Sequence, residues 1–189
     1  MRGTSRLIVA TAGVVVALLL QVTVMPHFAW DGVVPDLVLL TVVGAALVTD
    51  PRFATLLGFS AGLLLDIAPP ADHVAGRWAL SLLVVGYVVG RLAHDHQPAQ
   101  AGVRPSYPLM VVAGAGGAFI GSSVYALTGL VLRDPAVDVG QLLEVVLAAL
   151  AYDVLAALVA VPLTVWAFTR EPGSRSPKVT PRAPRRAPA

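Results

Sequence analysis

The chain has 189 residues, a net charge of +2 and no cysteine. Hydrophobic residues make up 57% of it and charged residues only 13%, whereas about 25% of the residues in a typical soluble domain are charged. The mean hydropathy of +0.79 agrees with this excess of apolar residues. The composition predicts an integral membrane protein, and the absence of cysteine excludes a disulfide framework, thiolate metal ligands and a cysteine nucleophile.

Six apolar stretches follow one another along the chain. They cover residues 7–25, 33–48, 53–68, 78–93, 108–132 and 142–168. A helix that crosses a bilayer needs about 20 apolar residues, so the second and third stretches are a little short. None of the six alternates as a barrel strand would, and the connections are too short for a further domain. The pattern predicts an all-α integral membrane fold, a six-helix transmembrane bundle over residues 1–170.

The first stretch follows Arg2 and Arg6 and could be mistaken for a signal peptide. Its apolar core is too long for one, and no small-x-small cleavage site follows it. We therefore expect a retained first helix. The last stretch is long enough to tilt or bend, and Pro162 marks the expected place, because proline lacks a backbone N–H.

Residues 171–189 are rich in Pro, Arg, Ser and Ala, and this composition predicts a disordered tail. Its basic residues, together with the one just before it, are Arg170, Arg175, Lys178, Arg182, Arg185 and Arg186. Since the positive charge lies largely here, it does not indicate nucleic-acid binding. A basic residue beside anionic lipid gains about 1 kcal/mol, so we expect a cytoplasmic anchor that lies on the bilayer. A protein-binding tail is the alternative.

The basic residues also predict the orientation. If the N-terminus is cytoplasmic, all but two of the 13 Lys and Arg residues fall in inner segments, and only Arg77 and Arg133 lie outside. The positive-inside rule then places both termini in the cytoplasm.

This topology places four charged residues in the outer half of the bundle: Asp36, Asp66, Arg77 and Glu144. Asp36 follows Pro35, which suits a helix start, and it needs no ligand to explain it. Asp66 either forms a structural pair with Arg77 or binds a ligand. Asp153 lies deeper in the last helix, where a carboxyl is costly, so we expect it to pair with another helix or with a bound partner.

Small residues four apart mark two helices, at Gly58 and Gly62 and at Gly86 and Gly90. This spacing puts both members of each pair on one helix face, where helices can approach closely. We therefore predict that these four glycines form helix-packing interfaces.

No pattern in the chain supports catalysis. His94-Asp95-His96 has the spacing of metal ligands, but a third convincing ligand is lacking, so no metal is predicted. A Walker-type phosphate loop is absent and the Ser122-Ser123 pair has no base beside it. We expect a protein without enzymatic activity and without a cofactor.

Three segments in order resemble the MreD family of bacterial rod shape-determining membrane proteins. Residues 35–40 read Pro-Asp-Leu-Val-Leu-Leu, and residues 58–66 read Gly-Phe-Ser-Ala-Gly-Leu-Leu-Leu-Asp. Gly76-x-x-Ala79-Leu80 then leads to residues 85–91, Val-Gly-Tyr-Val-Val-Gly-Arg. The resemblance covers residues 35–91, while the last two helices carry no diagnostic motif and the tail is an addition to the family's core.

The resemblance implies a function and a set of partners. Proteins of this family are non-enzymatic inner-membrane components of the peptidoglycan elongation machinery. They bind MreC and, through it, MreB filaments, the RodA glycosyltransferase and a class B transpeptidase. The fold implied is similar to the six-helix substrate-binding subunits of energy-coupling-factor transporters. The expected function is thus a membrane scaffold that helps to control cell shape by binding an MreC-like partner.

A substrate-binding subunit of a vitamin-type transporter is the alternative function. It would turn Asp36, Asp66 and Arg77 toward a small ligand. Such a site normally gathers aromatic and polar side chains from several outer loops. Only 6% of this chain is aromatic and its outer loops are brief, which favours the scaffold. A lipid or lipid-linked precursor in an outer pocket is a further alternative that the sequence leaves open.

Overall fold

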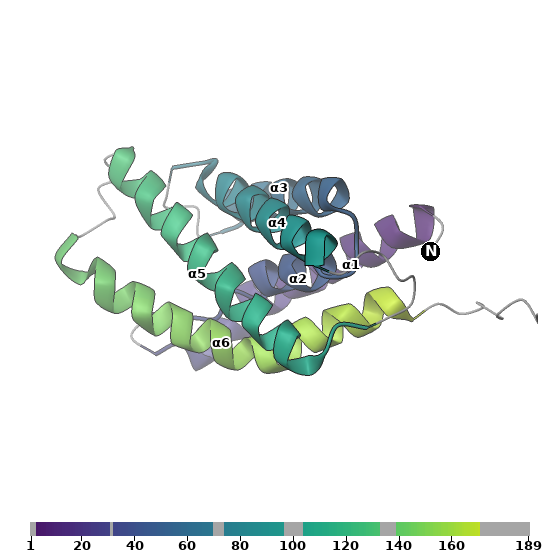
Figure 1. The fold of residues 1–189 in the computed structure, drawn as a ribbon. Coiled ribbons are helices and arrows are strands. Elements are labelled where there is room, and N and C mark those ends of the chain that lie inside the picture. Colours follow the sequence, from purple (N-terminus) through teal and green to yellow (C-terminus); the bar gives the residue numbers. More distant parts are fainter. Residues whose placement is uncertain (1–2, 31, 70–73, 97–103, 133–138, 171–189) are drawn as a thin grey trace, which may run out of the picture.

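The structure is a computed structural model that describes residues 3–30, 32–69, 74–96, 104–132 and 139–170, with the side chains of residues 139–144 excepted. Within these ranges the chain forms six α-helices, one short 3-10 helix and no strand, which confirms the prediction of an all-helical fold (Figure 1). The elements are α1 (Gly3–Thr23), η1 (Met25–Phe28), α2 (Leu37–Ala46), α3 (Pro51–Ile67), α4 (Arg77–His96), α5 (Tyr107–Val131) and α6 (Val139–Thr169).

Three helices are long and apolar enough to cross a membrane. They are α1, α5 and the Val145–Thr169 part of α6, and α2 is apolar but shorter. Large apolar side chains cover much of the outside of the bundle, for example Val112 at 67% and Val159 at 69% exposure. A soluble monomer rarely exposes so much apolar surface, whereas lipid would cover it at no cost. These features support the prediction of a membrane protein.

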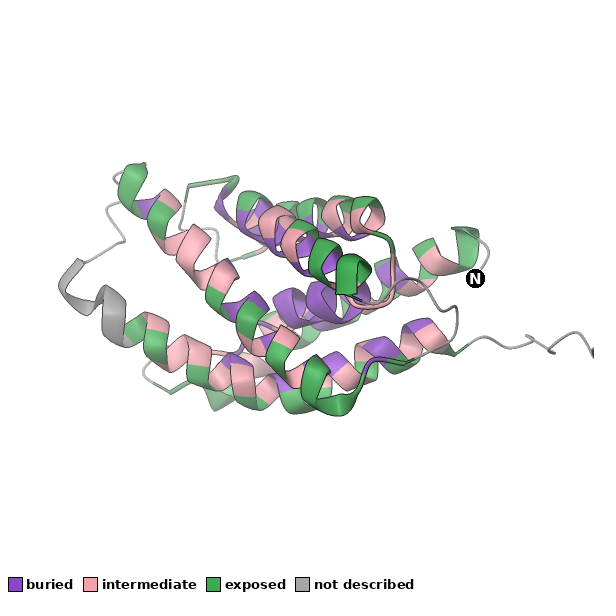
Figure 2. Cartoon of the chain, viewed as in Figure 1, coloured by how far each residue is buried: buried purple, intermediate pink, exposed green. Residues whose placement is uncertain are grey.

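Helix α2 lies at the centre of the bundle and contacts each of the other five α-helices. Nine of its ten residues are buried, and Figure 2 shows the helix in the burial colour along nearly its whole length. A helix that is apolar on every side needs such surroundings. Its side chains, among them Leu39, Leu40 and Val43, form the middle of the main apolar core.

Helices α3 and α4 form the closest pair and run antiparallel along one side of the bundle (Figure 1). A Cβ atom placed on Gly58 would lie 2.1 Å from the carbonyl oxygen of Leu82, and one on Gly62 would lie 2.2 Å from that of Trp78. From α4, a Cβ on Gly86 would lie 2.3 Å from the carbonyl oxygen of Ala54. These distances leave no room for a side chain, so backbone meets backbone along the pair.

The fourth glycine of this set, Gly90, is less tightly enclosed. A Cβ there would lie 3.1 Å from the Cα of Pro51. Glycines also bring α5 against α2, since a Cβ on Gly117 or Gly121 would lie 2.4 Å from the side chain of Val43 or Leu39, respectively. Close approach through small residues thus recurs in the bundle, as is common where helices pack in membranes.

Helix α6 continues through Pro162 as a single helix. Proline lacks an N–H and therefore leaves the carbonyl oxygen four residues earlier without its helical donor. That oxygen belongs to Leu158, and the hydroxyl of Tyr107 at the start of α5 donates to it at 3.1 Å. A hydroxyl group from the neighbouring helix thus replaces the missing N–H donor.

We predict that Gly58→Ala lowers the free energy of unfolding by about 1–3 kcal/mol, because the new methyl group forces two backbones apart. Gly116→Ala is the matched control, since a Cβ there meets nothing within 4 Å, and better helix propensity adds up to about 1 kcal/mol. Thermal or denaturant unfolding in detergent measures both. Equal stability of the two variants would contradict the close contact.

Candidate functional site

The buried polar side chains cluster where α2 and α4 begin, at what we call the capped end of the bundle. The first backbone N–H groups of any helix have no partner within that helix. At this end they are buried or part-buried, and side chains accept their hydrogen bonds.

Asp66, on the last turn of α3, accepts the hydrogen bonds at the start of α4. One carboxylate oxygen accepts from the N–H groups of Gly76 and Ala79, at 2.9 and 3.0 Å, and the other accepts from Trp78 at 3.1 Å. The side chain is only 4% exposed. Asp66 therefore caps a helix other than its own and ties α3 to α4 through charge-assisted hydrogen bonds.

The residue at the cap position of α4 explains why the carboxylate must come from elsewhere. Gly76 accepts the first helical hydrogen bond, from Leu80, but it has no side chain to cap the helix. Its φ angle is +96°, which favours glycine over residues with a Cβ. A glycine turn and a carboxylate from α3 thus share one capping task.

Three helices supply the acceptors at the start of α2. Asp36 is the N-cap and accepts from Leu39 N–H at 2.9 Å. Gln21 of α1 accepts from Val38 N–H at 3.0 Å, and Asp153 of α6 accepts from the N–H of Asp36 at 2.6 Å. The central helix is therefore fixed to α1 and α6 by hydrogen bonds to its own backbone.

Asp36 and Asp153 bring two acidic side chains together in the interior, at 7% and 3% exposure. The second carboxyl oxygen of Asp36 is buried and has no hydrogen-bond partner among the described residues. The two carboxyl groups are near enough for their charges to repel each other. Placing two acidic side chains together here is costly, because repulsion is strong where water is excluded.

Arg77, the first residue of α4, is 3% exposed. Its Nη2 donates to the carbonyl oxygen of Tyr125 at 2.9 Å, and its guanidinium lies 3.9 Å from the centre of the Tyr125 ring. The Trp78 ring also packs on Tyr125, with 4.4 Å between ring centroids. One turn further along α4, the Ser81 hydroxyl donates to the carbonyl oxygen of Gly121 at 2.6 Å. These contacts join α4 to α5.

The charged residues expected together in the outer half of the bundle lie at two separate helix starts. Asp66 and Arg77 lie at the start of α4, whereas Asp36 lies at the start of α2 with Asp153. The side chain of Glu144 and the basic residues after Arg170 lie outside the described residues.

Sequence reasoning missed three residues that take part in these contacts: Gln21, Ser81 and Tyr125. A signal for Gln21 exists, because it is a polar residue that follows Ala10, Val14 and Ala17 at helical spacing, on the face of α1 that is buried.

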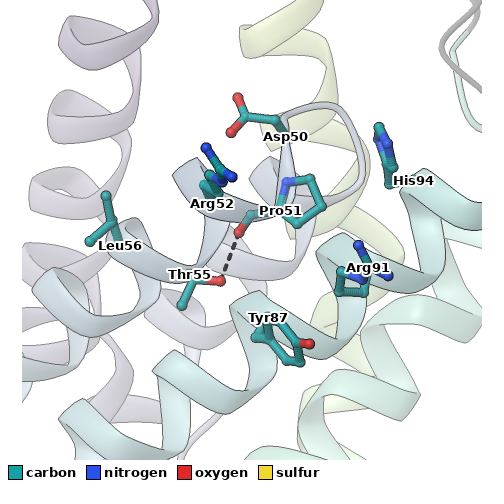
Figure 3. Close-up of a pocket in the computed structure, with 8 residues that line it drawn as sticks. All are labelled: Asp50, Pro51, Arg52, Thr55, Leu56, Tyr87, Arg91 and His94. Carbon is teal, nitrogen blue, oxygen red and sulfur yellow. Dashed lines mark hydrogen bonds between the residues drawn. The ribbon is translucent and has the colours of Figure 1, made fainter.

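The opposite end of the bundle, where α1 and α3 begin and α4 and α6 end, has a different character (Figure 1). We call it the basic end. A surface hollow of about 700 Å³ lies there between the start of α3 and the end of α4 (Figure 3). Its lining residues are Asp50, Pro51, Arg52, Thr55, Leu56, Tyr87, Arg91 and His94. Asp36 and Asp66 take no part in it.

The His94-Asp95-His96 segment ends α4 beside this hollow. The His96 ring nitrogen Nδ1 hydrogen-bonds the carbonyl oxygen of Leu92 at 2.9 Å, and Asp95 lies 3.6 Å from Arg91. Among the described residues, no three His, Asp or Glu side chains are grouped so that they could hold a metal ion.

Comparison of the chain with protein-family models, curated proteins and solved structures gives no match. The geometry itself shows polar side chains that serve backbone groups and glycines that let helices meet.

We predict that Asp66→Ala lowers the free energy of unfolding by about 3 kcal/mol, since it leaves the buried N–H of Ala79 and the part-buried N–H groups of Gly76 and Trp78 without their acceptor, and a buried N–H without an acceptor costs about 1–3 kcal/mol. Asp66→Asn, with one acceptor oxygen, should fall between. The exposed Asp95 on α4 provides the control, because Asp95→Ala should change stability by less than about 0.5 kcal/mol. A loss for Asp95→Ala as large as for Asp66→Ala would refute the capping role.

We predict that Asp153→Asn is at least as stable as the original chain, whereas Asp153→Ala is less stable by about 1–3 kcal/mol. The asparagine keeps an oxygen to accept from Asp36 N–H, removes one of two like charges and offers an N–H₂ to the unpartnered Asp36 oxygen. Unfolding in detergent at neutral pH distinguishes the two variants. If Asn destabilises as much as Ala does, the role assigned to Asp153 is wrong.

Proposed function

We propose that the chain is a non-enzymatic scaffold of the bacterial cytoplasmic membrane, of the MreD type, that binds an MreC-like protein. In this proposal all six helices form one transmembrane bundle with both termini in the cytoplasm. Through the MreC-like partner it would act with MreB-like filaments, a RodA-like glycosyltransferase and a class B transpeptidase in peptidoglycan synthesis.

One observation carries the proposal. Six of the residues that carry the family resemblance cap helices or let helices meet closely: Asp36, Gly58, Gly62, Asp66, Gly86 and Gly90. A motif that builds a rigid bundle is what a scaffold requires, because its surface must keep one shape to bind a partner.

The same contacts weigh against a transporter subunit. Asp66 and Asp36 direct their carboxylates to backbone N–H groups, and Arg77 stacks on Tyr125. A ligand site would need such groups to converge on an accessible cavity. These three side chains are buried instead, each at most 7% exposed.

The distribution of arginines supports the orientation in the proposal. Arg6, Arg52, Arg91 and Arg170 lie near the ends of helices that meet at the basic end, whereas Arg77 is buried at the capped end. The positive-inside rule then favours a cytoplasmic basic end.

Co-purification with an MreC-like protein tests the function. We predict that the unaltered chain retains this partner and that Gly62→Leu loses most of it, because leucine cannot fit against the Trp78 backbone and α3 must move away from α4. Gly116→Leu, at an exposed position in α5, is the control and should retain the partner. Failure of the unaltered chain to retain an MreC-like protein, or full retention by Gly62→Leu, would contradict the proposal.

A further inference from the structure

The hollow at the basic end combines positive charge with an apolar wall. Arg52 comes from the first turn of α3, and Arg91 and His94 come from the end of α4. In Figure 3 these three side chains stand on both sides of Pro51, with the Tyr87 ring below them. Guanidinium groups are suited to phosphate because their N–H donors match its oxygens in pairs. The Tyr87 hydroxyl adds a further donor.

The two acids nearby are already engaged. Asp50 accepts from Phe53 N–H at 2.9 Å and from the Arg6 guanidinium. Burial raises the pKa of Asp50, but the hydrogen bonds to its carboxylate and the positive charge of Arg6 together outweigh this effect and hold the pKa below its usual value. Asp95 forms an exposed pair with Arg91, which is weak in water. Three guanidinium groups, those of Arg6, Arg52 and Arg91, thus stand against two carboxylates, and the region keeps a positive charge.

The apolar wall of the hollow continues along the side of the bundle. Leu56 follows Arg52 by one turn, and Phe59, Leu63 and Ile67 follow it at helical spacing on the same exposed face of α3. Leu56 is 67% and Ile67 68% exposed. In a membrane this stripe meets acyl chains, while Arg52 reaches the level of the headgroups.

We propose that the hollow binds the phosphate of an anionic phospholipid, with the acyl chains of the lipid along the exposed face of α3. The charge selects the anionic headgroup and the stripe selects a lipid. An acidic peptide from the aqueous side would use the arginines but would leave the apolar stripe without a role. This site does not depend on the scaffold function.

The test is a titration of the full-length chain in detergent with phosphatidylglycerol, followed by the shift in its thermal unfolding. Phosphatidylcholine is the zwitterionic comparison and should bind more weakly. The double variant Arg52→Gln/Arg91→Gln should weaken phosphatidylglycerol binding roughly 25-fold, since each basic residue near an anionic lipid surface contributes about a fivefold preference. The single variants Arg52→Gln and Arg104→Gln form a matched pair, because Arg104 is also exposed but lies outside the hollow.

Further variants distinguish a lipid from a soluble phosphate as the ligand. Leu56→Ser should lower the affinity for phosphatidylglycerol but leave any binding of inorganic phosphate unchanged. Arg52→Lys/Arg91→Lys should recover part of the affinity, and circular dichroism should show unchanged helicity for all variants, whose altered side chains are exposed.

Three results would each overturn the proposal. The first is equal binding of the two lipids. The second is a loss for Arg104→Gln equal to that for Arg52→Gln, which would leave only general surface charge. The third is displacement of phosphatidylglycerol by inorganic phosphate or by a polyglutamate peptide at lower concentration than the lipid, which would assign the hollow to a soluble phosphate or to an acidic peptide.

Discussion

Two helices of this bundle begin in buried surroundings, and the arrangement of the other helices depends on how their first N–H groups find acceptors. The ten residues of α2 span about 15 Å, half of the roughly 30 Å of a bilayer's hydrocarbon layer. In a membrane at least one of its ends must therefore lie away from water. Asp36, Gln21 and Asp153 supply the acceptors that water would provide elsewhere. Asp66 does the same for α4.

This constraint links the polar residues to the glycines. The Asp66 carboxylate reaches the start of α4 only because Gly62, one turn earlier on α3, lets the Trp78 backbone approach. The cap and the close contact thus depend on one another, and a larger residue at Gly62 would separate the carboxylate from its donors. For the same reason the motif from Gly58 to Asp66 acts as one structural unit rather than as a packing face with a separate acid.

The two ends of the bundle use charge in opposite ways. At the capped end the charged groups are buried and directed to backbone N–H groups, carbonyl oxygen and an aromatic ring. At the basic end Arg52 and Arg91 are exposed around an open hollow. Charges buried in helix caps hold the fold and are not accessible to a ligand, whereas exposed arginines remain accessible to anions. The proposed binding surface for lipid therefore lies at the end where Arg52 and Arg91 remain exposed.

The all-helical class, the six helices and the close-packing glycines could be predicted from the sequence, because apolar length and small-residue spacing are local properties. The Pro35-Asp36 pair likewise predicted the start of the second helix, since a proline followed by an acid is a local signal. The hydrogen-bond partners of the acidic side chains could not be predicted in this way, because they depend on how the helices pack. Asp153 lies 117 positions from Asp36 along the chain, and the Tyr107 hydroxyl that completes α6 at Pro162 comes from another helix. No local pattern encodes such contacts, since they arise from how α1, α5 and α6 pack around α2.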